Sequence, residues 1–314
     1  MDGPDARGPF DALLGGVDLV TFDCFGTLVD WTAGLAELGV GQDRMPQFRN
    51  ECELRQRPHR RGAAFIPYRQ LLEQVAAAVA PDLPAETHAA FARRFGELPL
   101  FPDVREAMGL LSQCVAIGVV SNCDALHQLD VSRQLGVPWD VCATAEELGA
   151  YKPTDPAWDG AVALVEAAGF SRDRWLHVSA WDDDDLVPAA MRGVATCWIG
   201  REGGVAPALG ACDLLFADLT TLAEAFASAK RGPILHEVVF TGEPAALERL
   251  VTLPVPRARK VELVRESPMR LRLLARFTTE ALHRAFVREA SRWSFERVVV
   301  EHHHGRVVAR PPSP

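Results

Sequence analysis

The chain has 314 residues, of which 48% are hydrophobic and 24% charged, and its formal net charge is −9. This composition is typical of folded globular proteins and excludes disorder as the dominant state. No apolar run of 18 or more residues is present, which excludes a transmembrane helix, and the N-terminus lacks the basic start and apolar centre of a secretory signal. Seven cysteines without a CxxC pair are unlike a disulfide framework, so we expect a cytoplasmic protein.

The two parts of the chain differ in charge. Residues 1–229 contain 17 Lys and Arg against 33 Asp and Glu, whereas residues 230–314 contain 16 against 9. A shift of this size indicates a domain boundary, and the sequence KRGP at 230–233 has the composition of a linker. We therefore predict that a separate, basic accessory domain covers residues 230–314.

Short apolar segments alternate with helical ones in the first part. This alternation predicts an α/β fold with a doubly wound parallel sheet, a Rossmann-like hydrolase core whose chemistry lies at the carboxyl ends of the strands. The expected strands are 17–23, 114–122, 139–147, 175–181 and 195–200, with helices at about 124–135 and 157–168. We assign residues 1–30 and 101–229 to this core.

Residues 31–100 interrupt the alternation. They contain no strand candidate but several helical segments, including 68–79 and 86–98. An all-helical insertion directly after the first strand predicts a cap over the carboxyl edge of the sheet.

The basic C-terminal region has its own pattern, which predicts a small α+β domain of the split β-α-β type. Strands are expected at 234–240, 258–266 and 269–277, helices at 244–253 and 278–293, and a final hairpin from 295–301 and 305–310 that turns at His302–Gly305. Its charge predicts docking on an acidic partner, either the first domain of the same chain or a second copy in a homodimer. It has no RNA-binding aromatic signature, so nucleic acid is not an expected partner. A membrane is not an expected partner either, because the sequence has no transmembrane segment.

Polar residues stand where the predicted strands end. Asp23 follows the first strand, and a carboxylate there can attack an electrophile to form an ester. Ser121 and Asn122 end the second strand, where they can hold an anionic group, and Lys152 precedes a proline in an extended or turn conformation. Four carboxylates, at 182–185, follow the fourth strand. Each feature taken singly is also compatible with an ordinary solvated strand end.

This ordered set resembles the haloacid dehalogenase superfamily over about residues 15–228. The segments FDCFGTLVDW, TAEELGAYKP and D-x-x-P-A look like its 2-haloacid dehalogenase branch, which has a helical cap. Carried over by position, the resemblance implies that Asp23 is the nucleophile, Ser121 the hydroxyl of the second motif and Lys152 the lysine of the third. Asp185, or Asp184 because the register is uncertain by one residue, is the acid of the fourth.

Further residues beside these motifs are expected at the substrate. We predict substrate contacts from Cys24, Phe25, Thr27, Ser121, Asn122 and Trp181, although Cys24 lacks a His partner and also reads as a small buried hydrophobic residue. The resemblance also implies a cap arginine that holds the substrate. Six candidates occur in the cap, and the sequence does not choose among them: Arg49, Arg55, Arg57, Arg60, Arg61 and Arg69.

The second residue after the nucleophile departs from the phosphatases of this superfamily. They usually carry a second Asp there as a general acid and base, whereas this chain has Phe25. Positioned acid–base catalysis contributes about 10²–10⁴-fold, which a phosphomonoesterase would lose. A halide is a weak base and leaves without a proton, so Phe25 favours displacement at carbon. Phosphonate-cleaving and P-type ATPase relatives also lack the second Asp.

The sequence therefore predicts a hydrolase that displaces halide from a small, anionic 2-haloacid through an ester on Asp23, without a cofactor. Two alternatives stay open. One is a phosphatase or phosphonatase with Mg²⁺ between Asp23 and Asp185. The other is a catalytically degenerate binding protein, because residues 179–180 are Ser-Ala where phosphatases have Gly-Asp.

Overall fold

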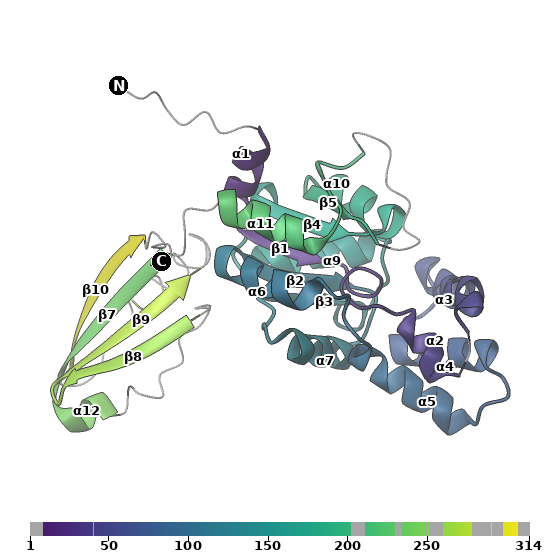
Figure 1. The fold of residues 1–314 in the computed structure, drawn as a ribbon, viewed down its shortest axis with the longest axis horizontal. Helices are drawn as coiled ribbons and strands as arrows, with labels where there is room; N and C mark the ends of the chain where they lie inside the picture. The colour runs from purple at the N-terminus through teal and green to yellow at the C-terminus, as the bar shows by residue number, and fades with distance from the viewer. Residues whose placement is uncertain are drawn as a thin grey trace. The chain divides into compact units, whose positions relative to one another are not determined.

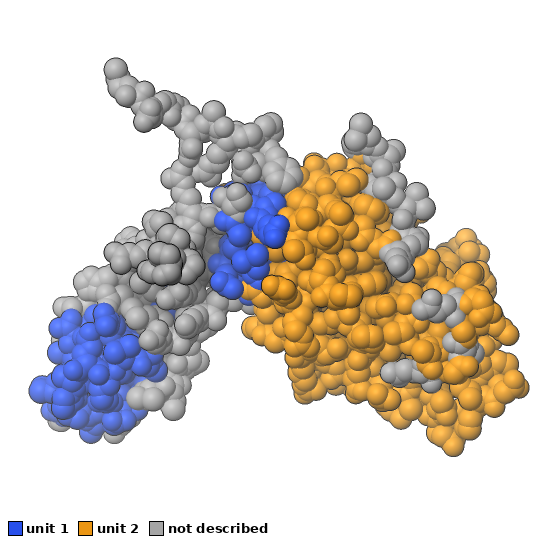
Figure 2. Space-filling view, in the orientation of Figure 1, with its two compact units in different colours: residues 1–18, 110–116, 224–314 blue, residues 19–109, 117–223 orange. Residues whose placement is uncertain are grey.

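The computed structural model describes residues 9–39, 41–201, 211–229, 234–248, 250, 260–277, 290 and 298–306. Two compact units are distinguished in Figure 2, one formed by residues 1–18, 110–116 and 224–314 and the other by residues 19–109 and 117–223. The predicted linker at 230–233 lies outside the described residues. Among the helices that are described, none has the length and apolar composition needed to cross a membrane.

A six-stranded parallel sheet forms the core of the α/β part, in the order β3-β2-β1-β4-β5-β6 (Figure 1). Its strands are β1 Leu19–Phe22, β2 Ala116–Ser121, β3 Val141–Thr144, β4 Trp175–Ser179, β5 Ala195–Ile199 and β6 Leu214–Phe216. The first five confirm the predicted strands. The sixth was not predicted, because three residues at a sheet edge are too short to show a periodic pattern.

The helices of this part alternate with the strands, as the doubly wound fold requires, and α1 precedes β1. They are α1 Pro9–Gly16, α6 Val104–Cys114, α7 Ala125–Leu135, α8 Ala145–Leu148, α9 Asp155–Ala167, α10 Val187–Ala190 and α11 Leu219–Ala229. All residues of β1, β2 and β4 are buried, which explains why these strands are continuous apolar runs rather than alternating ones.

The strand order reverses at β1, which lies between β2 and β4. Ligand sites of open α/β sheets form at such a point, outside the carboxyl ends of the strands. The backbone N–H of Asp23 continues the pairing by donating to Val178 O at 3.0 Å. The residues that follow β1, β2 and β4 therefore meet at one edge of the sheet.

The cap prediction is confirmed, since every named element between residues 31 and 100 is helical. These are α2 Ala33–Glu37, α3 Met45–Arg60, α4 Tyr68–Val79 and α5 Ala85–Arg94, with 3-10 turns at Gln42–Arg44 and Phe95–Glu97. The buried residues of α3 recur every three to four positions: Met45, Phe48, Cys52 and Gln56. A polar residue thus continues the buried face of α3.

The C-terminal region forms a separate antiparallel sheet in the order β10-β7-β9-β8. Its elements are β7 Ile234–Gly242, α12 Pro244–Glu248, β8 Lys260–Ser267, β9 Arg270–Phe277 and β10 Val298–Arg306. Because β9 pairs antiparallel with both neighbours, β7 and β8 run parallel on either side of it. This is the expected split β-α-β arrangement.

The predicted hairpin turn at His302–Gly305 is wrong. These residues lie within β10, where His302 pairs with Val238 and Gly305 with Leu235 of β7. Polar residues that interrupt two apolar runs are typical of a turn, but a partner strand that matches the whole segment keeps the backbone extended. The helix predicted at 278–293 lies outside the described residues except for Ala290, which is helical and buried.

The centre of the sheet is packed too closely for a side chain at Gly118 of β2. A Cβ atom there would lie 2.6 Å from Val141 O and 3.2 Å from Thr21 Cγ2, so we expect Gly118→Ala to lower the free energy of unfolding by about 1–3 kcal/mol. The matched control is Gly109→Ala in α6, where a Cβ meets nothing within 4 Å, and which should raise stability by up to ~1 kcal/mol. Urea unfolding of both variants checks this. Equal changes in the free energy of unfolding in the two variants would contradict the close packing at Gly118.

Candidate active site

Asp23 lies directly after β1 with 6% of its surface exposed. Its two oxygens accept hydrogen bonds from different groups, Oδ1 from Lys152 Nζ at 3.0 Å and Oδ2 from Thr27 Oγ1 at 2.9 Å. Burial raises the pKa of Asp23, while the Lys152 ammonium and the Thr27 hydroxyl draw it down. The carboxylate is therefore held in one orientation by two donors.

A glycine makes the loop after Asp23 possible. Gly26 has φ +91°, a left-handed conformation that other residues rarely adopt, and a Cβ there would lie 2.9 Å from the Trp181 ring. The indole of Trp181 therefore packs directly on the loop that follows Asp23. This close approach brings the segment after β4 next to the segment after β1.

The Lys152 ammonium joins two carboxylates. Its three donated hydrogen bonds go to Asp23 Oδ1 at 3.0 Å, Asp185 Oδ1 at 2.5 Å and Val120 O at 2.8 Å. Burial by itself would lower the pKa of Lys152, but the two carboxylates hold it above its usual value. The group is therefore a permanent buried cation with all three N–H bonds used.

Asp185 is nearly inaccessible and accepts three side-chain donors. Oδ1 accepts from Lys152 and from His177 Nε2 at 3.1 Å, and Oδ2 accepts from Ser179 Oγ at 3.0 Å. Burial by itself would raise the pKa of Asp185, but Lys152 and His177 hold it below its usual value. Ser179, a departure from the phosphatase pattern, thus orients this carboxylate.

Asp184 has a different environment from its neighbour. The two residues lie in a π-helical turn at Asp182–Leu186, a wide turn often found at functional sites. Asp184 pairs with Arg60 Nη2 at 2.7 Å, and about a third of its side chain is exposed. Burial raises the pKa of Asp184 to about 6, although Arg60 draws it down.

Asn122 connects the core to the cap. Its Oδ1 accepts from the backbone N–H of Lys152 at 2.7 Å, and its Nδ2 lies 3.2 Å from both Lys152 O and Gln56 Oε1. Gln56 is the polar residue on the buried face of α3. A side chain from the end of β2 therefore holds the segment that carries Lys152 and contacts the cap in the same place.

Two of the six candidate cap arginines line the cavity, and they differ in their partners. Arg60 donates to Glu53 Oε2 at 2.7 Å and to Asp184, so its charge is already matched. Arg49 makes no ion pair in the described part of the chain, and its buried Nε has no hydrogen-bond partner there. Its guanidinium lies 5.8 Å from the Trp31 ring centre and 5.5 Å from that of Trp181. Arg49 is therefore the cavity arginine whose charge a substrate can use.

These groups surround a cavity of about 180 Å³ between the sheet edge and the cap. Eight predicted site residues line it: Asp23, Phe25, Ser121, Asn122, Lys152, Trp181, Asp184 and Asp185. The other two predicted residues, Cys24 and Thr27, are fully buried and do not line the cavity. Cys24 packs as a small hydrophobic residue, and Thr27 contacts the site by its hydrogen bond to Asp23.

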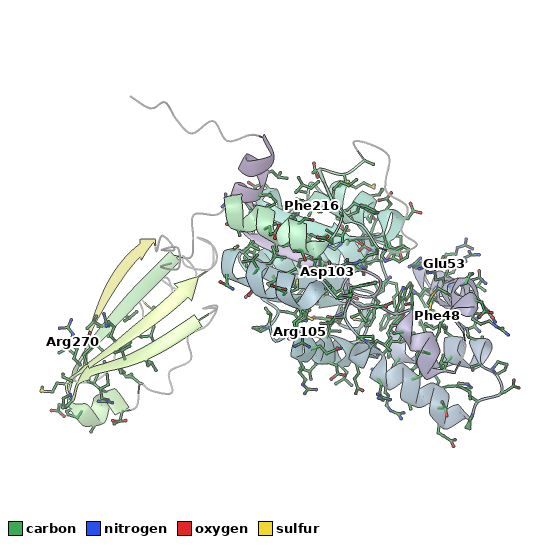
Figure 3. All side chains as sticks on the ribbon, in the orientation of Figure 1. Phe48, Glu53, Asp103, Arg105, Phe216 and Arg270 are labelled. Carbon is green, nitrogen blue, oxygen red and sulfur yellow. The ribbon has the colours of Figure 1, made fainter. Side chains whose placement is uncertain are left out.

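The sequence analysis missed five residues that line the cavity: Trp31, Cys52, Glu53, Gln56 and Tyr68. Figure 3 shows Phe48 and Glu53 on α3, the cap helix that supplies most of them. The spacing of buried positions along α3 was the available signal, because Cys52 and Gln56 continue the stripe of Met45 and Phe48.

The carboxylates do not fit a magnesium site in this arrangement. In the residues that the structure describes, no three His, Cys, Asp or Glu side chains come together to hold a metal ion. The two predicted Mg²⁺ ligands, Asp23 and Asp185, are joined by the Lys152 ammonium, and each of their four oxygens accepts a hydrogen bond from a protein donor.

No family model matches the chain, but it is similar to several known hydrolases. The L-2-haloacid dehalogenase PA0810 is 26% identical, with a TM-score of 0.59 over 68% of this chain and 99% of that one. The defluorinating L-2-haloacid dehalogenase Rha0230 is 25% identical, with a TM-score of 0.58 over 67% of this chain and 95% of that one. The pyrimidine 5'-nucleotidase YjjG of Escherichia coli (strain K12) is 29% identical over 133 residues, which cover 40% of this chain and only 58% of the nucleotidase.

From the raised pKa of Asp184 we predict how the stability of the protein depends on pH. Because its folded-state pKa is about 6 against an ordinary 3.8, the folded protein binds this proton more tightly than the unfolded chain, and the resulting stabilisation is lost as the pH rises from 4 through 6. Asp184→Asn should therefore gain stability relative to the wild type between pH 4 and pH 7 in urea unfolding. Asp183→Asn, which removes an exposed carboxylate from the same turn, is the control. A stability difference between the wild type and Asp184→Asn that stays constant with pH would refute this assignment.

Proposed function

We propose that the chain is a hydrolase of the haloacid dehalogenase superfamily, like the L-2-haloacid dehalogenases to which it is similar, and that it displaces halide from a small 2-haloacid. The observation that carries the proposal is Phe25, which lines the cavity beside the nucleophile where a phosphatase needs an acid. Its ring packs at 4.7 Å on Phe95 and carries no group that could donate a proton. A leaving group that needs no proton suits such a site.

The cavity favours a small substrate with a carboxylate. Its volume of about 180 Å³ is below the range of about 300–1,000 Å³ that is usual for drug-sized ligands, which disfavours a nucleotide. Arg49 supplies an unmatched cation on the cap side, and an arginine can bind a carboxylate with two parallel hydrogen bonds. We therefore assign the substrate carboxylate to Arg49.

The first chemical step uses Asp23. One of its oxygens attacks the carbon that bears the halogen, the carbon–halogen bond breaks, and the halide leaves with the bonding electrons. The product is an ester between Asp23 and the substrate carbon. Lys152 opposes the effect of burial on the pKa of Asp23 and so favours the ionised carboxylate that acts as the nucleophile.

The second step hydrolyses the ester. Water attacks the carbonyl carbon of the ester and gives a proton to Asp185, the bond to the alkyl oxygen breaks, and Asp185 returns the proton to the departing 2-hydroxy acid. Asp23 then loses its remaining proton to solvent. Asp185 suits this role better than Asp184, because Lys152 joins it to Asp23, whereas Asp184 is paired with Arg60.

A phosphatase is the second candidate function, and the sequence match to YjjG favours it. Under this alternative, phosphoryl transfer to Asp23 would need Mg²⁺, and the carboxylates would have to exchange Lys152 for the metal ion. The two candidates therefore differ in their dependence on a metal.

The nucleophile assignment predicts metal-independent turnover. With EDTA present, the wild type should release halide from 2-chloro- or 2-bromopropionate, and Asp23→Asn should lower the rate by roughly 10⁴-fold. In a single turnover in H₂¹⁸O, the label should enter the carboxyl group of Asp23 rather than the product, because water attacks the ester carbonyl. Phosphate release that requires Mg²⁺, with no halide release from any 2-haloacid, would support the phosphatase instead.

The substrate-binding assignment predicts a change in KM. Arg49→Gln removes the unmatched cation, and loss of a charged hydrogen bond of about 1.5–3 kcal/mol raises KM roughly 10- to 100-fold. The control is Arg55→Gln on the same helix, since Arg55 pairs with Glu51 at 3.0 Å and does not line the cavity. Steady-state halide release measures both, and an Arg49→Gln enzyme with an unchanged KM would disprove the assignment.

A further inference from the structure

Three polar side chains form a hydrogen-bonded chain behind the cavity, at the centre of the sheet. Trp175 Nε1 donates to Thr21 Oγ1 at 2.7 Å, Thr21 Oγ1 lies 2.8 Å from His177 Nδ1, and His177 Nε2 lies 3.1 Å from Asp185 Oδ1. Thr21 and His177 are paired across β1 and β4, and neither is exposed. None of the three lines the cavity, and the chain of hydrogen bonds meets the site at Asp185.

The partners fix the direction of these hydrogen bonds. The indole N–H of Trp175 can only donate, and the Asp185 carboxylate can only accept, so His177 carries a proton on Nε2. Burial lowers the pKa of His177, which keeps the imidazole neutral and leaves Nδ1 without a proton. Thr21 therefore donates to Nδ1, and every bond in the chain points toward Asp185.

Packing by itself does not account for this chain. Placing a hydroxyl and an imidazole at the centre of a buried sheet is costly unless both are hydrogen-bonded, and apolar residues would fill the same space without that constraint. The ring of Trp158 packs perpendicular to His177 at 5.0 Å and restricts its rotation further. The chain thus presents one N–H to one oxygen of Asp185.

We infer that His177 is a positioning residue for ester hydrolysis, in which its Nε2–H orients Asp185 toward the attacking water. Oδ1 of Asp185 accepts from both Lys152 and His177, so this oxygen is saturated. In the described part of the chain Oδ2 accepts only the Ser179 hydroxyl, which leaves a lone pair for water. The inferred role rests on the proposed function, but the hydrogen bond itself does not.

Kinetics of two His177 variants test the role. His177→Leu removes the N–H and should slow ester hydrolysis, which lowers kcat roughly 10- to 100-fold, the loss of one hydrogen bond to a charged group. KM should fall in the same proportion and kcat/KM should change less than about twofold, because His177 does not touch the cavity and does not take part in ester formation. His177→Gln keeps an N–H near Nε2 and should recover most of kcat. In His177→Leu the ester on Asp23 should accumulate, which the intact mass of quenched enzyme detects.

A control separates positioning from structural damage. Thr196 of β5 is also a buried polar residue of the sheet, and its hydroxyl donates to Asp213 at 3.1 Å, away from the site. Thr196→Val should lower the thermal midpoint without changing kcat. If His177→Leu folds and keeps the wild-type kcat, or if it raises KM and lowers kcat equally with no rescue by Gln, the positioning role is overturned.

The hydrogen bond can be measured without any substrate. In full-length protein labelled with ¹⁵N-histidine, one imidazole should be neutral and protonated on Nε2 at pH 6–8, should disappear in His177→Gln and should shift in Asp185→Asn. An Nδ1–H tautomer or a charged ring at this position would overturn the inference even if the enzyme is active. Absence of halide release from the wild type would overturn the proposed function and the role in hydrolysis, while this spectrum would still decide the hydrogen bond.

Discussion

The bridge from the Lys152 ammonium to Asp23 and Asp185 is the interaction on which the site depends. Two carboxylates buried at one sheet edge repel each other, and each resists ionisation because burial removes its water. One ammonium group between them opposes both effects, since its N–H bonds reach an oxygen of each carboxylate at 3.0 and 2.5 Å. Without it, at least one carboxyl group would bind a proton and lose its role.

The bridge also explains how neighbouring carboxylates acquire different properties. Asp185 is saturated with donors on one oxygen, and its pKa is held low, whereas the pKa of Asp184 rises to about 6 in the turn that faces Arg60. Groups whose environments drive their pKa values apart can take different parts in a reaction. The proposed mechanism uses this difference, with Asp185 joined to Asp23 through Lys152 and Asp184 paired with Arg60 of the cap.

The cap supplies site residues that are distant in sequence from the core residues they contact. Its helix α3 brings Arg49 between Trp31 and Trp181, and the flat rings stabilise the guanidinium without neutralising its charge. On the same helix, Gln56 meets Asn122 of the core. The cap therefore contributes the Arg49 cation, which makes no ion pair among the described residues, and a hydrogen bond from Asn122 to Gln56 that forms only when the cap lies over the sheet edge.

Some features followed directly from the sequence because their signals are local. Buried parallel strands are continuous apolar runs, the apolar residues of helices recur every three to four positions, and Asp23 stands at a strand end before a glycine turn. The five strands, the helical cap and the positions of Asp23, Ser121 and Lys152 could be read in this way. The hairpin at His302–Gly305 failed because the same polar residues suit a turn or a strand, and only the pairing with β7 distinguishes the two.

The tertiary structure decided what depends on partners distant in the sequence. The sequence does not distinguish the six cap arginines, but in the structure Arg60 pairs with Asp184 while Arg49 lies against two indole rings. Asp184 and Asp185 differ only through contacts made by Lys152, His177 and Arg60. His177 itself reads as one polar residue within an apolar strand until Thr21 and Asp185 are placed on either side of it. The sequence by itself determined the doubly wound core and its helical cap, because periodicity and strand ends are local, whereas charge balance and hydrogen-bond direction required the three-dimensional neighbours.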